Sequence, residues 1–425
     1  MPVARGSPHG LPVHSLPHRR RPGGGLSIST PDTRPRTLIL WLAAATFAIG
    51  LTEFAAMTLL PHYAAEFGVT EPQASRAVSA YAIGVVVGAP VLSLGLARWD
   101  RRVSLLALLG LFTVGNLLAA AAPSLGLLVA ARFVAGLPHG ALFGIAQLVA
   151  ATSLGRDRAA QAVAWVATGL TVATVVGVPG LSVLGQATSW RLPFVLVAVL
   201  AVVCAVALAR LVPQGSGGVR RSARAELGAF TNPDVLLPLA MGAIGFGGLF
   251  AVYSFLSATL MSHTHAPAWA VPLVLMAYGV GGIIGNLLAG RTPERRLLLS
   301  AGLFQLLIGV ATLVYSTTVD HWWLMLFSVA LVGIGGGLVV PLQTRIMHVA
   351  GEAQTMAAAL NHAAFNAANA IGPAVAGAAL AAGWGWRSTG WVGAGLSLAG
   401  LAVWAVIMLR ERARQGDGAR PVVRS

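Results

Sequence analysis

Residues 37–61 read TLILWLAAATFAIGLTEFAAMTLLP, an apolar run whose single charge is Glu53. About 20 consecutive apolar residues are enough for a helix to cross the hydrocarbon core of a bilayer, so this run predicts a membrane span. Similar runs recur along the chain, in which 56% of the 425 residues are hydrophobic and only 10% are charged. About a quarter of the residues of an ordinary soluble domain are charged. The sequence therefore predicts an all-α polytopic membrane protein.

Twelve spans are expected. Their approximate ranges are 38–61, 75–97, 103–122, 125–150, 159–187, 191–212, 234–262, 268–290, 296–316, 321–348, 353–382 and 386–409. Most arginines lie in alternate connections, and the positive-inside rule places those connections and both chain ends in the cytoplasm. The formal net charge of +15 is then a signal of topology, and we expect no nucleic-acid partner.

Composition also excludes several classes of site. All 28 basic residues are arginines, so the chain has no Walker A lysine and we expect no ATP site. The one cysteine, Cys204, allows neither an intramolecular disulfide nor a thiolate metal cluster. The histidines are scattered among the tail, the outer connections and separate spans, which argues against a metal site, a catalytic cluster and an enzyme. We expect no cofactor other than a proton as coupling ion.

The two halves of the chain repeat. AYAIGVVVG at 80–88 matches AYGVGGIIG at 277–285, and Trp190-Arg191 matches Trp386-Arg387. Each matched segment of the second half lies six spans after its counterpart, and because six is an even number the two halves have the same orientation in the membrane. Parallel repeats of this kind are a transporter architecture, with substrate bound between the halves. We expect two six-helix bundles around a central cavity. The boundaries follow as a disordered basic cytoplasmic tail over 1–36, bundles over 37–212 and 234–410, a cytoplasmic linker over 213–233 and a disordered cytoplasmic tail over 411–425.

Two charges lie well inside the spans of the first half, Glu53 and Arg132, away from the span ends. At about 1.5 Å per helical residue, both lie in the outer part of the hydrocarbon core at similar depth. Intramembrane charges are costly alone and usually pair, so we expect Glu53 and Arg132 to face each other across the cavity. Two interpretations are open: Glu53 binds and releases a proton during transport, or the pair is a static contact between spans.

Other polar and small residues mark the spans. His362, Asn366 and Asn369 form one helical stripe in the eleventh span, where they either contact substrate or bond a neighbouring helix. Gly177, Pro179 and Gly180 in the fifth span are either a hinge or tight seal between the halves or ordinary packing. The remaining candidates for the cavity are Tyr81, His139, Gln147 and Tyr278.

These features resemble the major facilitator superfamily over residues 38–410, and within it the twelve-span drug:proton antiporters of the bacterial arabinose-efflux and chloramphenicol-resistance branch. LTEF at 51–54, Arg132 with Gly136, GVPG at 177–180 and AFNAANAIG at 364–372 are similar to motifs of that branch. The resemblance implies a role for Arg132 in proton transfer and a location in the bacterial inner membrane.

In the family that this sequence resembles, the cytoplasmic connections carry gating motifs. The first keeps Gly95 and the basic pair Arg101-Arg102, but Trp99 stands at the usual place of an acid and Asp100 follows it. The equivalent basic pair of the second half is Arg295-Arg296.

We therefore expect a monomeric transporter in the lipid bilayer that exports small molecules in exchange for protons, through alternating access. The alternatives are proton-coupled or facilitated import of a sugar-like nutrient, and a membrane sensor or scaffold that transports nothing. The sequence does not identify the substrate.

Overall fold

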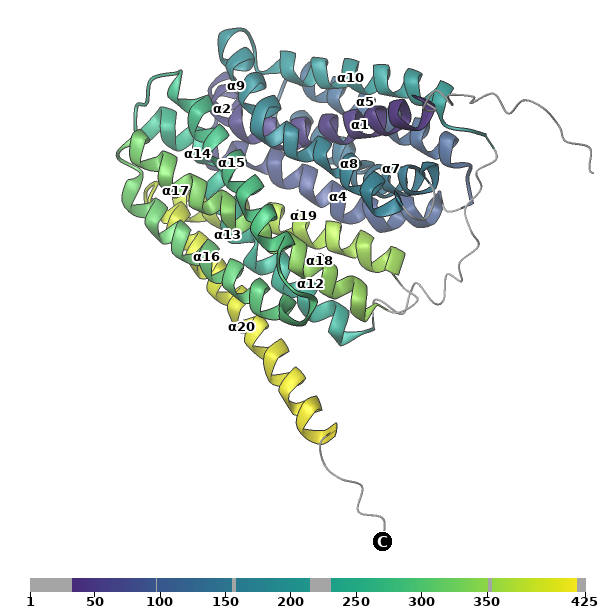
Figure 1. Cartoon of the computed structure of the whole chain (residues 1–425). Coiled ribbons are helices and arrows are strands. Elements are labelled where there is room, and N and C mark those ends of the chain that lie inside the picture. Colours follow the sequence, from purple (N-terminus) through teal and green to yellow (C-terminus); the bar gives the residue numbers. More distant parts are fainter. Residues whose placement is uncertain (1–32, 97, 155–157, 215–230, 351–353, 419–425) are drawn as a thin grey trace, which may run out of the picture. The chain divides into compact units, whose positions relative to one another are not determined.

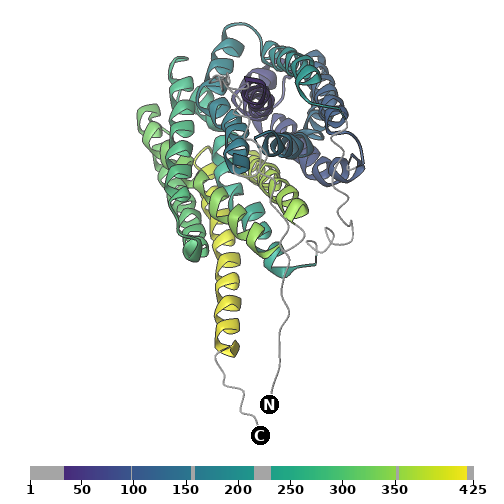
Figure 2. The same ribbon diagram turned by 45° about the vertical axis from the view of Figure 1, so that its right-hand side comes forward.

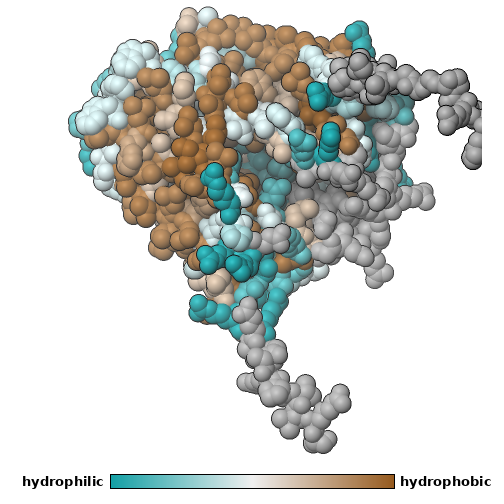
Figure 3. All heavy atoms as spheres, viewed as in Figure 1, coloured by the Kyte–Doolittle hydropathy of each residue, from teal (hydrophilic) through white to brown (hydrophobic). Residues whose placement is uncertain are grey.

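The computed structural model describes residues 33–96, 98–154, 158–214, 231–350 and 354–418. Twelve helical segments of this part are long and apolar enough to cross a membrane, which confirms the predicted fold class. On the face shown in Figure 3, hydrophobic residues cover most of the described surface. Of the tail expected over 1–36, residues 1–32 lie outside the described residues, and residues 33–36 belong to the first helix instead. Most of the expected linker, 215–230, also lies outside the described residues.

The first six spans contain ten α-helices and one π-helical turn. They are α1 (Thr33–Thr58), α2 (Leu60–Phe67), α3 (Glu71–Ala74), α4 (Arg76–Gly95), α5 (Arg101–Ala121), α6 (Leu125–Gly136), α7 (His139–Ser153), α8 (Ala159–Val172), η2 (Ala173–Gly177), α9 (Val178–Ala187) and α10 (Arg191–Leu211).

The last six spans are interrupted more often. They comprise α12 (Pro233–Gly245), α13 (Gly247–Tyr253), α14 (Leu256–Ala258), η4 (Thr259–His263), α15 (Ala270–Gly290), η5 (Glu294–Arg296), α16 (Leu297–Thr318), α17 (Trp322–Gly335), η6 (Gly336–Leu338), α18 (Val339–Val349), α19 (Gln354–Ala381) and α20 (Ser388–Gly418). Helix α20 is longer than expected, so residues 411–418 are helical although the sequence analysis placed them in a disordered tail.

Equivalent helices pack in equivalent ways in the two six-span repeats. In the first, α4 packs on α6 and α5 packs on α10; in the second, α15 packs on α17 and α16 packs on α20. Between the repeats, α19 packs along α4, and α15 packs on η2 and α9. Figures 1 and 2 show α4 beside α19, with the amino-terminal spans in purple and blue and the later ones in green and yellow.

Glycines let the paired helices come close together in both repeats. A Cβ on Gly84 of α4 would collide with the carbonyl oxygen of Phe133, and one on Gly281 of α15 would collide with that of Ala330. Small residues allow this backbone approach in membranes, where no hydrophobic effect drives helices together. The glycines of the repeated sequence are therefore contact points of the fold.

Arginines that follow a tryptophan hold the connections on one face of the bundle together. We call this the loop face; it carries the connections at 59–70, 122–124, 188–190, 264–269, 319–321 and 382–387. Arg191 pairs with Glu66 and donates to the carbonyl oxygen of Ala122 at 2.8 Å. Arg387 pairs with Asp320, which also contacts His263 Nε2 at 2.9 Å. The matched Trp-Arg pairs thus perform the same structural task in each repeat.

The contacts of Glu66 predict a small acid-dependent loss of stability. The hydrogen bond from Arg191 holds the pKa of Glu66 below its ordinary value of 4.5. A depressed pKa stabilises the folded state above pH 4.5, and this stabilisation is lost as pH falls through the lowered value. Because the pair is exposed to solvent, we expect Glu66→Gln to cost less than about 1 kcal/mol at pH 7.

Thermal unfolding of the wild type and of Glu66→Gln across pH 3–7 (about the range of carboxylate titration) measures this difference. The difference should shrink toward the acid end. A difference that stayed constant over the whole range would contradict the assignment of this stabilisation to the ionised carboxylate.

Candidate functional site

Glu53 lies on α1 where the two repeats meet, and its side chain is buried. The residue is only 6% exposed. Oε1 accepts a hydrogen bond of 2.9 Å from Nδ2 of Asn369, which belongs to α19 in the second repeat. Oε2 lies 4.0 Å from Nδ1 of His139 on α7. The carboxylate therefore has one neutral hydrogen-bond donor from the second repeat and one titratable neighbour from the first.

Tyr81 and His139 connect this carboxylate to Arg132. The hydroxyl of Tyr81 lies 3.0 Å from Nδ1 of His139, and the guanidinium carbon of Arg132 lies 4.3 Å from the centre of the Tyr81 ring. Such a cation–π contact is stronger where water is excluded. The contacts run from Glu53 to His139, to Tyr81 and then to Arg132.

Glu53 and Arg132 form no salt bridge among the described residues, so the two charges do not pair directly; that they face each other across a cavity stays a prediction. Among the described side chains they are nevertheless the only buried acid and the only buried guanidinium. The helical rise estimated their depth along the bundle, but it carried no information about the direction in which each side chain leaves its helix. In the structure, His139 and Tyr81 connect the two charges in place of an ion pair.

Polar residues of the first repeat hold Arg132 in place. Nη1 donates a hydrogen bond of 2.9 Å to the hydroxyl of Thr52. That hydroxyl donates to Oδ1 of Asn116, whose own amide nitrogen donates to the carbonyl oxygen of Phe112 at 2.8 Å. The sequence analysis missed Thr52 and Asn116. The signal for Asn116 was available, because it is the only carboxamide in an otherwise apolar third span.

A break in the fourth span positions His139. Helix α6 ends at Gly136 and α7 begins at His139, after Pro138. Proline lacks the amide hydrogen that would continue the helix. His139 consequently occupies the first position of a new helix. From there its ring contacts both Tyr81 and Glu53.

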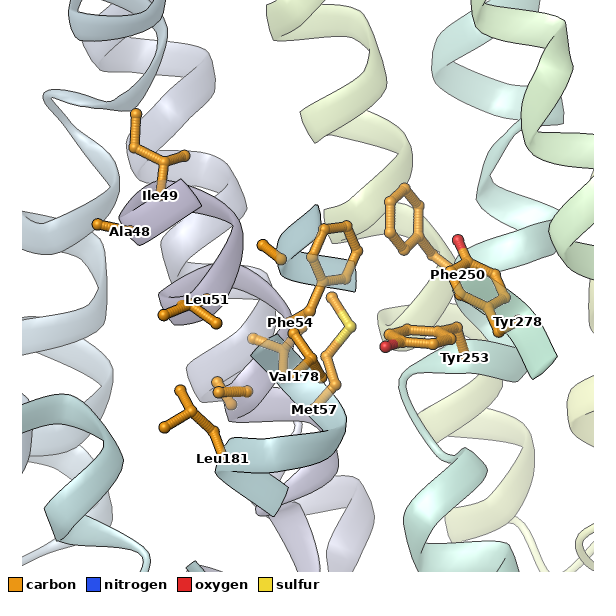
Figure 4. Close-up of a cluster of buried hydrophobic side chains, with 14 of the residues drawn as sticks. Ala48, Ile49, Leu51, Phe54, Met57, Val178, Leu181, Phe250, Tyr253 and Tyr278 are labelled. Carbon is orange, nitrogen blue, oxygen red and sulfur yellow. The ribbon is translucent and has the colours of Figure 1, made fainter. Parts of the chain in front are cut away.

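Aromatic residues of the two repeats meet beside Glu53. Phe54 of α1 lies 6.4 Å from Phe250 and 5.6 Å from Tyr253, measured between ring centres. Tyr278 lies 4.1 Å from Tyr253. Figure 4 shows Phe54 on the side of α1 that faces these three rings. Tyr278, a cavity candidate, therefore belongs to an apolar contact between the repeats.

The other cavity candidates are more dispersed. Asn366 donates a hydrogen bond of 3.0 Å to the carbonyl oxygen of His362 in its own helix. The ring of His362 lies 4.9 Å from that of Phe143. Gln147 is half-buried on α7, two turns beyond His139. The structure brings Asn369 and His139 to Glu53, and Tyr81 through His139. Among the described residues, no contact is recorded between Glu53 and Gln147, His362 or Asn366.

The motif residues expected to gate the transporter lie away from this site. Asp100 accepts hydrogen bonds from the amides of Arg102 and Val103, at 2.9 and 3.4 Å, and caps α5. Arg101 contacts the hydroxyl of Thr152 at 3.4 Å. Arg295 and Arg296 end the short helix η5, and Gly95 ends α4 with open space beside it.

The fifth span has a π-helical turn, η2, directly before Pro179. Gly177 packs on Phe47 and Leu51 of α1, within its own repeat, and Gly180 has open space beside it. The close contact between repeats forms one turn earlier, where a Cβ on Gly279 of α15 would lie 2.9 Å from the carbonyl oxygen of Thr174. The fifth span therefore contacts the second repeat through η2 at Thr174, while Gly177 packs on α1; a sealing role for this span stays a prediction.

In the part of the chain that the structure describes, no three His, Cys, Asp or Glu side chains are grouped so that they could hold a metal ion. What the site offers chemically is a buried carboxyl in contact with neutral hydrogen-bonding groups from both repeats.

The family model of the Major Facilitator Superfamily matches residues 42–353 and 294–421. The chain belongs to this superfamily. It is 39% identical to the inner membrane transport protein YdhP of Escherichia coli O157:H7, over 87% of this chain and 95% of the relative. This relative, like the superfamily, supports transport and not catalysis.

Two further relatives carry names that mention what they handle. The chain is 34% identical to a chloramphenicol resistance protein of Streptomyces lividans, over 80% of this chain and 88% of the relative. It is 28% identical to a probable sugar efflux transporter of Pasteurella multocida, over 77% and 81%. These relatives agree with the efflux-permease branch that the sequence resembles.

A solved structure shares the superfamily fold. The nucleoside transporter NupG superposes with a TM-score of 0.69 at 14% sequence identity, over 87% of this chain and 99% of that protein. At this identity the likeness concerns the fold alone. The structure and the relatives together establish a multi-pass membrane transporter of the superfamily.

Proposed function

We propose that this protein is a proton-coupled exporter of small molecules that works by alternating access, with Glu53 as the proton-binding residue. The observation that carries the proposal is the position of the Glu53 carboxyl, which is buried and bonded across the repeat boundary to Asn369. Alternating access moves one repeat against the other around a central site. A proton bound at this boundary is therefore in a place where it can affect that movement.

The surroundings of Glu53 support an exchangeable proton. A buried charge is costly unless it is paired and fully hydrogen-bonded. Glu53 has one hydrogen bond from a neutral amide and no salt bridge to Arg132. In this proposal the proton passes between Glu53 and His139, with Tyr81 orienting the imidazole and Arg132 providing a fixed positive charge behind the Tyr81 ring.

Export and sidedness rest on similarity and on arginine placement. Relatives named for chloramphenicol resistance and sugar efflux support export of an uncharged or weakly charged organic molecule. The positive-inside rule supports a cytoplasmic position for the arginine-rich face opposite the loop face and for both chain ends. The protein then acts as a monomer in the bacterial inner membrane, driven by protons and without ATP.

The experiment that tests the proposal is gradient-driven transport in proteoliposomes. Chloramphenicol and a panel of neutral sugars are offered, and flux is compared with and without an imposed pH gradient. We expect substrate to move in the direction opposite to the proton flow, and a protonophore to stop this movement of substrate. Movement of substrate in the same direction as protons would favour the importer, and no flux of any compound under any gradient would favour the sensor or scaffold.

A further inference from the structure

A buried carboxyl–amide pair joins the two repeats. Asn369 is 1% exposed and Glu53 6% exposed. Their hydrogen bond of 2.9 Å connects α19 to α1. Whatever changes the hydrogen-bonding capacity of Glu53 therefore changes a contact between the repeats.

Only one of the two polar atoms of the Asn369 side-chain amide forms a hydrogen bond among the described residues. Its nitrogen donates to Glu53, but its carbonyl oxygen, Oδ1, is buried and has no hydrogen-bond partner among the described residues. An ionised carboxylate accepts hydrogen bonds and has none to donate. A protonated carboxyl has one O–H donor, which is the group that Oδ1 lacks.

Asn369 is firmly attached to the second repeat. Three residues further along α19, a Cβ on Gly372 would lie 2.8 Å from the amide nitrogen of Ala251 on α13. On the other side, the hydroxyl of Ser79 on α4 donates to the carbonyl oxygen of Ala370 at 3.3 Å. The close packing of α19 on α13 holds the backbone near Asn369 against the second repeat, and the Ser79 contact holds α19 beside α4 of the first.

We propose that Asn369 is the positioning residue that makes contact between the repeats depend on the protonation of Glu53. Neutral Glu53 donates its O–H to Oδ1 of Asn369 while it accepts from Nδ2, and the two side chains form a pair with two hydrogen bonds. Loss of the proton removes the donor, leaves Oδ1 without a partner and weakens the contact. This inference rests on the proposed function, because it requires that Glu53 exchange a proton.

Other titratable groups surround the pair. His139 on α7 is the one in ion-pair range of the carboxylate, at 4.0 Å. Arg132 on α6 and Tyr81 on α4 lie behind it, and Tyr253 on α13 and Tyr278 on α15 face Glu53 from the second repeat. His362 lies two turns before Asn369 on α19. Among the described residues, none of these titratable groups has a recorded hydrogen bond to Glu53, whereas Asn369 does.

The test measures the distance between the repeats as a function of pH, without substrate. Spin labels are placed at Val103→Cys on α5 and Leu299→Cys on α16, two exposed positions in different repeats, after Cys204→Ser. The full chain is reconstituted in nanodiscs, and the populations of the distance distribution are recorded between acid and alkaline pH. We expect the wild type to shift between two populations.

Three variants separate the possible outcomes. Glu53→Gln keeps both hydrogen bonds to Asn369 at every pH, so it should hold the acid-side distribution. Asn369→Leu removes both bonds and should reduce the pH-dependent population change about 5-fold or more. The matched control is Ser79→Ala, which removes another hydrogen bond between the repeats that does not involve Glu53 and which should respond like the wild type.

The results distinguish this inference from the function on which it rests. A pH response that survives Glu53→Gln would remove Glu53 as the proton site and overturn both. A response that is lost in Glu53→Gln but intact in Asn369→Leu would overturn only the role of Asn369. Asn369→Ala, which introduces less bulk, gives the same comparison if the leucine variant does not fold.

Discussion

Glu53→Gln is expected to abolish the ability of a proton gradient to concentrate substrate, while exchange of substrate across the membrane continues. One charge moved through 100 mV is worth about 2.3 kcal/mol, which supports a gradient of about 50-fold for a neutral solute. The variant should lose this factor entirely, because glutamine cannot release a proton. Glutamine preserves the shape of the side chain and its hydrogen bond to Asn369, so the fold should persist.

Two assays in the same proteoliposomes measure this effect. Accumulation under an imposed gradient reports coupling, and counterflow of labelled substrate without a gradient reports binding and alternating access. Glu66→Gln is the matched control, because it removes an acid of the same type from the loop face and should accumulate substrate normally. Wild-type accumulation by Glu53→Gln would remove Glu53 from the coupling mechanism.

Gly84→Ala is expected to destabilise the fold, because it adds a methyl group where two helices are in backbone contact. The added Cβ would meet the carbonyl oxygen of Phe133 on α6, which belongs to the backbone and cannot rotate away. Helices α4 and α6 would have to separate, and overpacking of this kind costs about 1–3 kcal/mol or more. Gly281→Ala should behave alike, because its Cβ would meet the carbonyl oxygen of Ala330 on α17.

Thermal unfolding of the purified protein measures this loss of stability. The fraction of protein that remains monodisperse after heating gives a second measure. Gly110→Ala on α5 is the control, since nothing lies within 4 Å of a Cβ there. Alanine is also the better helix former, so the control should be neutral or slightly stabilised. If Gly84→Ala unfolded at the same temperature as Gly110→Ala, the close approach of α4 and α6 would not be a determinant of the fold.

The repeat was visible in the sequence because both copies meet the same geometric demand. Gly84 and Gly281 occupy matched positions, and each allows the close approach of a neighbouring helix in its own repeat. Arg191 and Arg387 likewise bind the connections of the loop face in their own repeats. Where a side chain must be small or must carry a charge, few residue types are acceptable at that position. The repeat can therefore be recognised in the amino-acid sequence.

The sequence by itself determined the class of protein. It indicated twelve apolar spans, parallel repeats, and an acid within the membrane whose desolvation is unfavourable unless the carboxyl is paired or takes part in function. These follow from the energy of placing each residue in lipid, which depends on that residue and its near neighbours. The tertiary structure alone decided the partners of the acid. Whether Glu53 meets Arg132, or His139 and Asn369, depends on the rotation of four helices around their axes, and packing between segments distant in sequence sets that rotation.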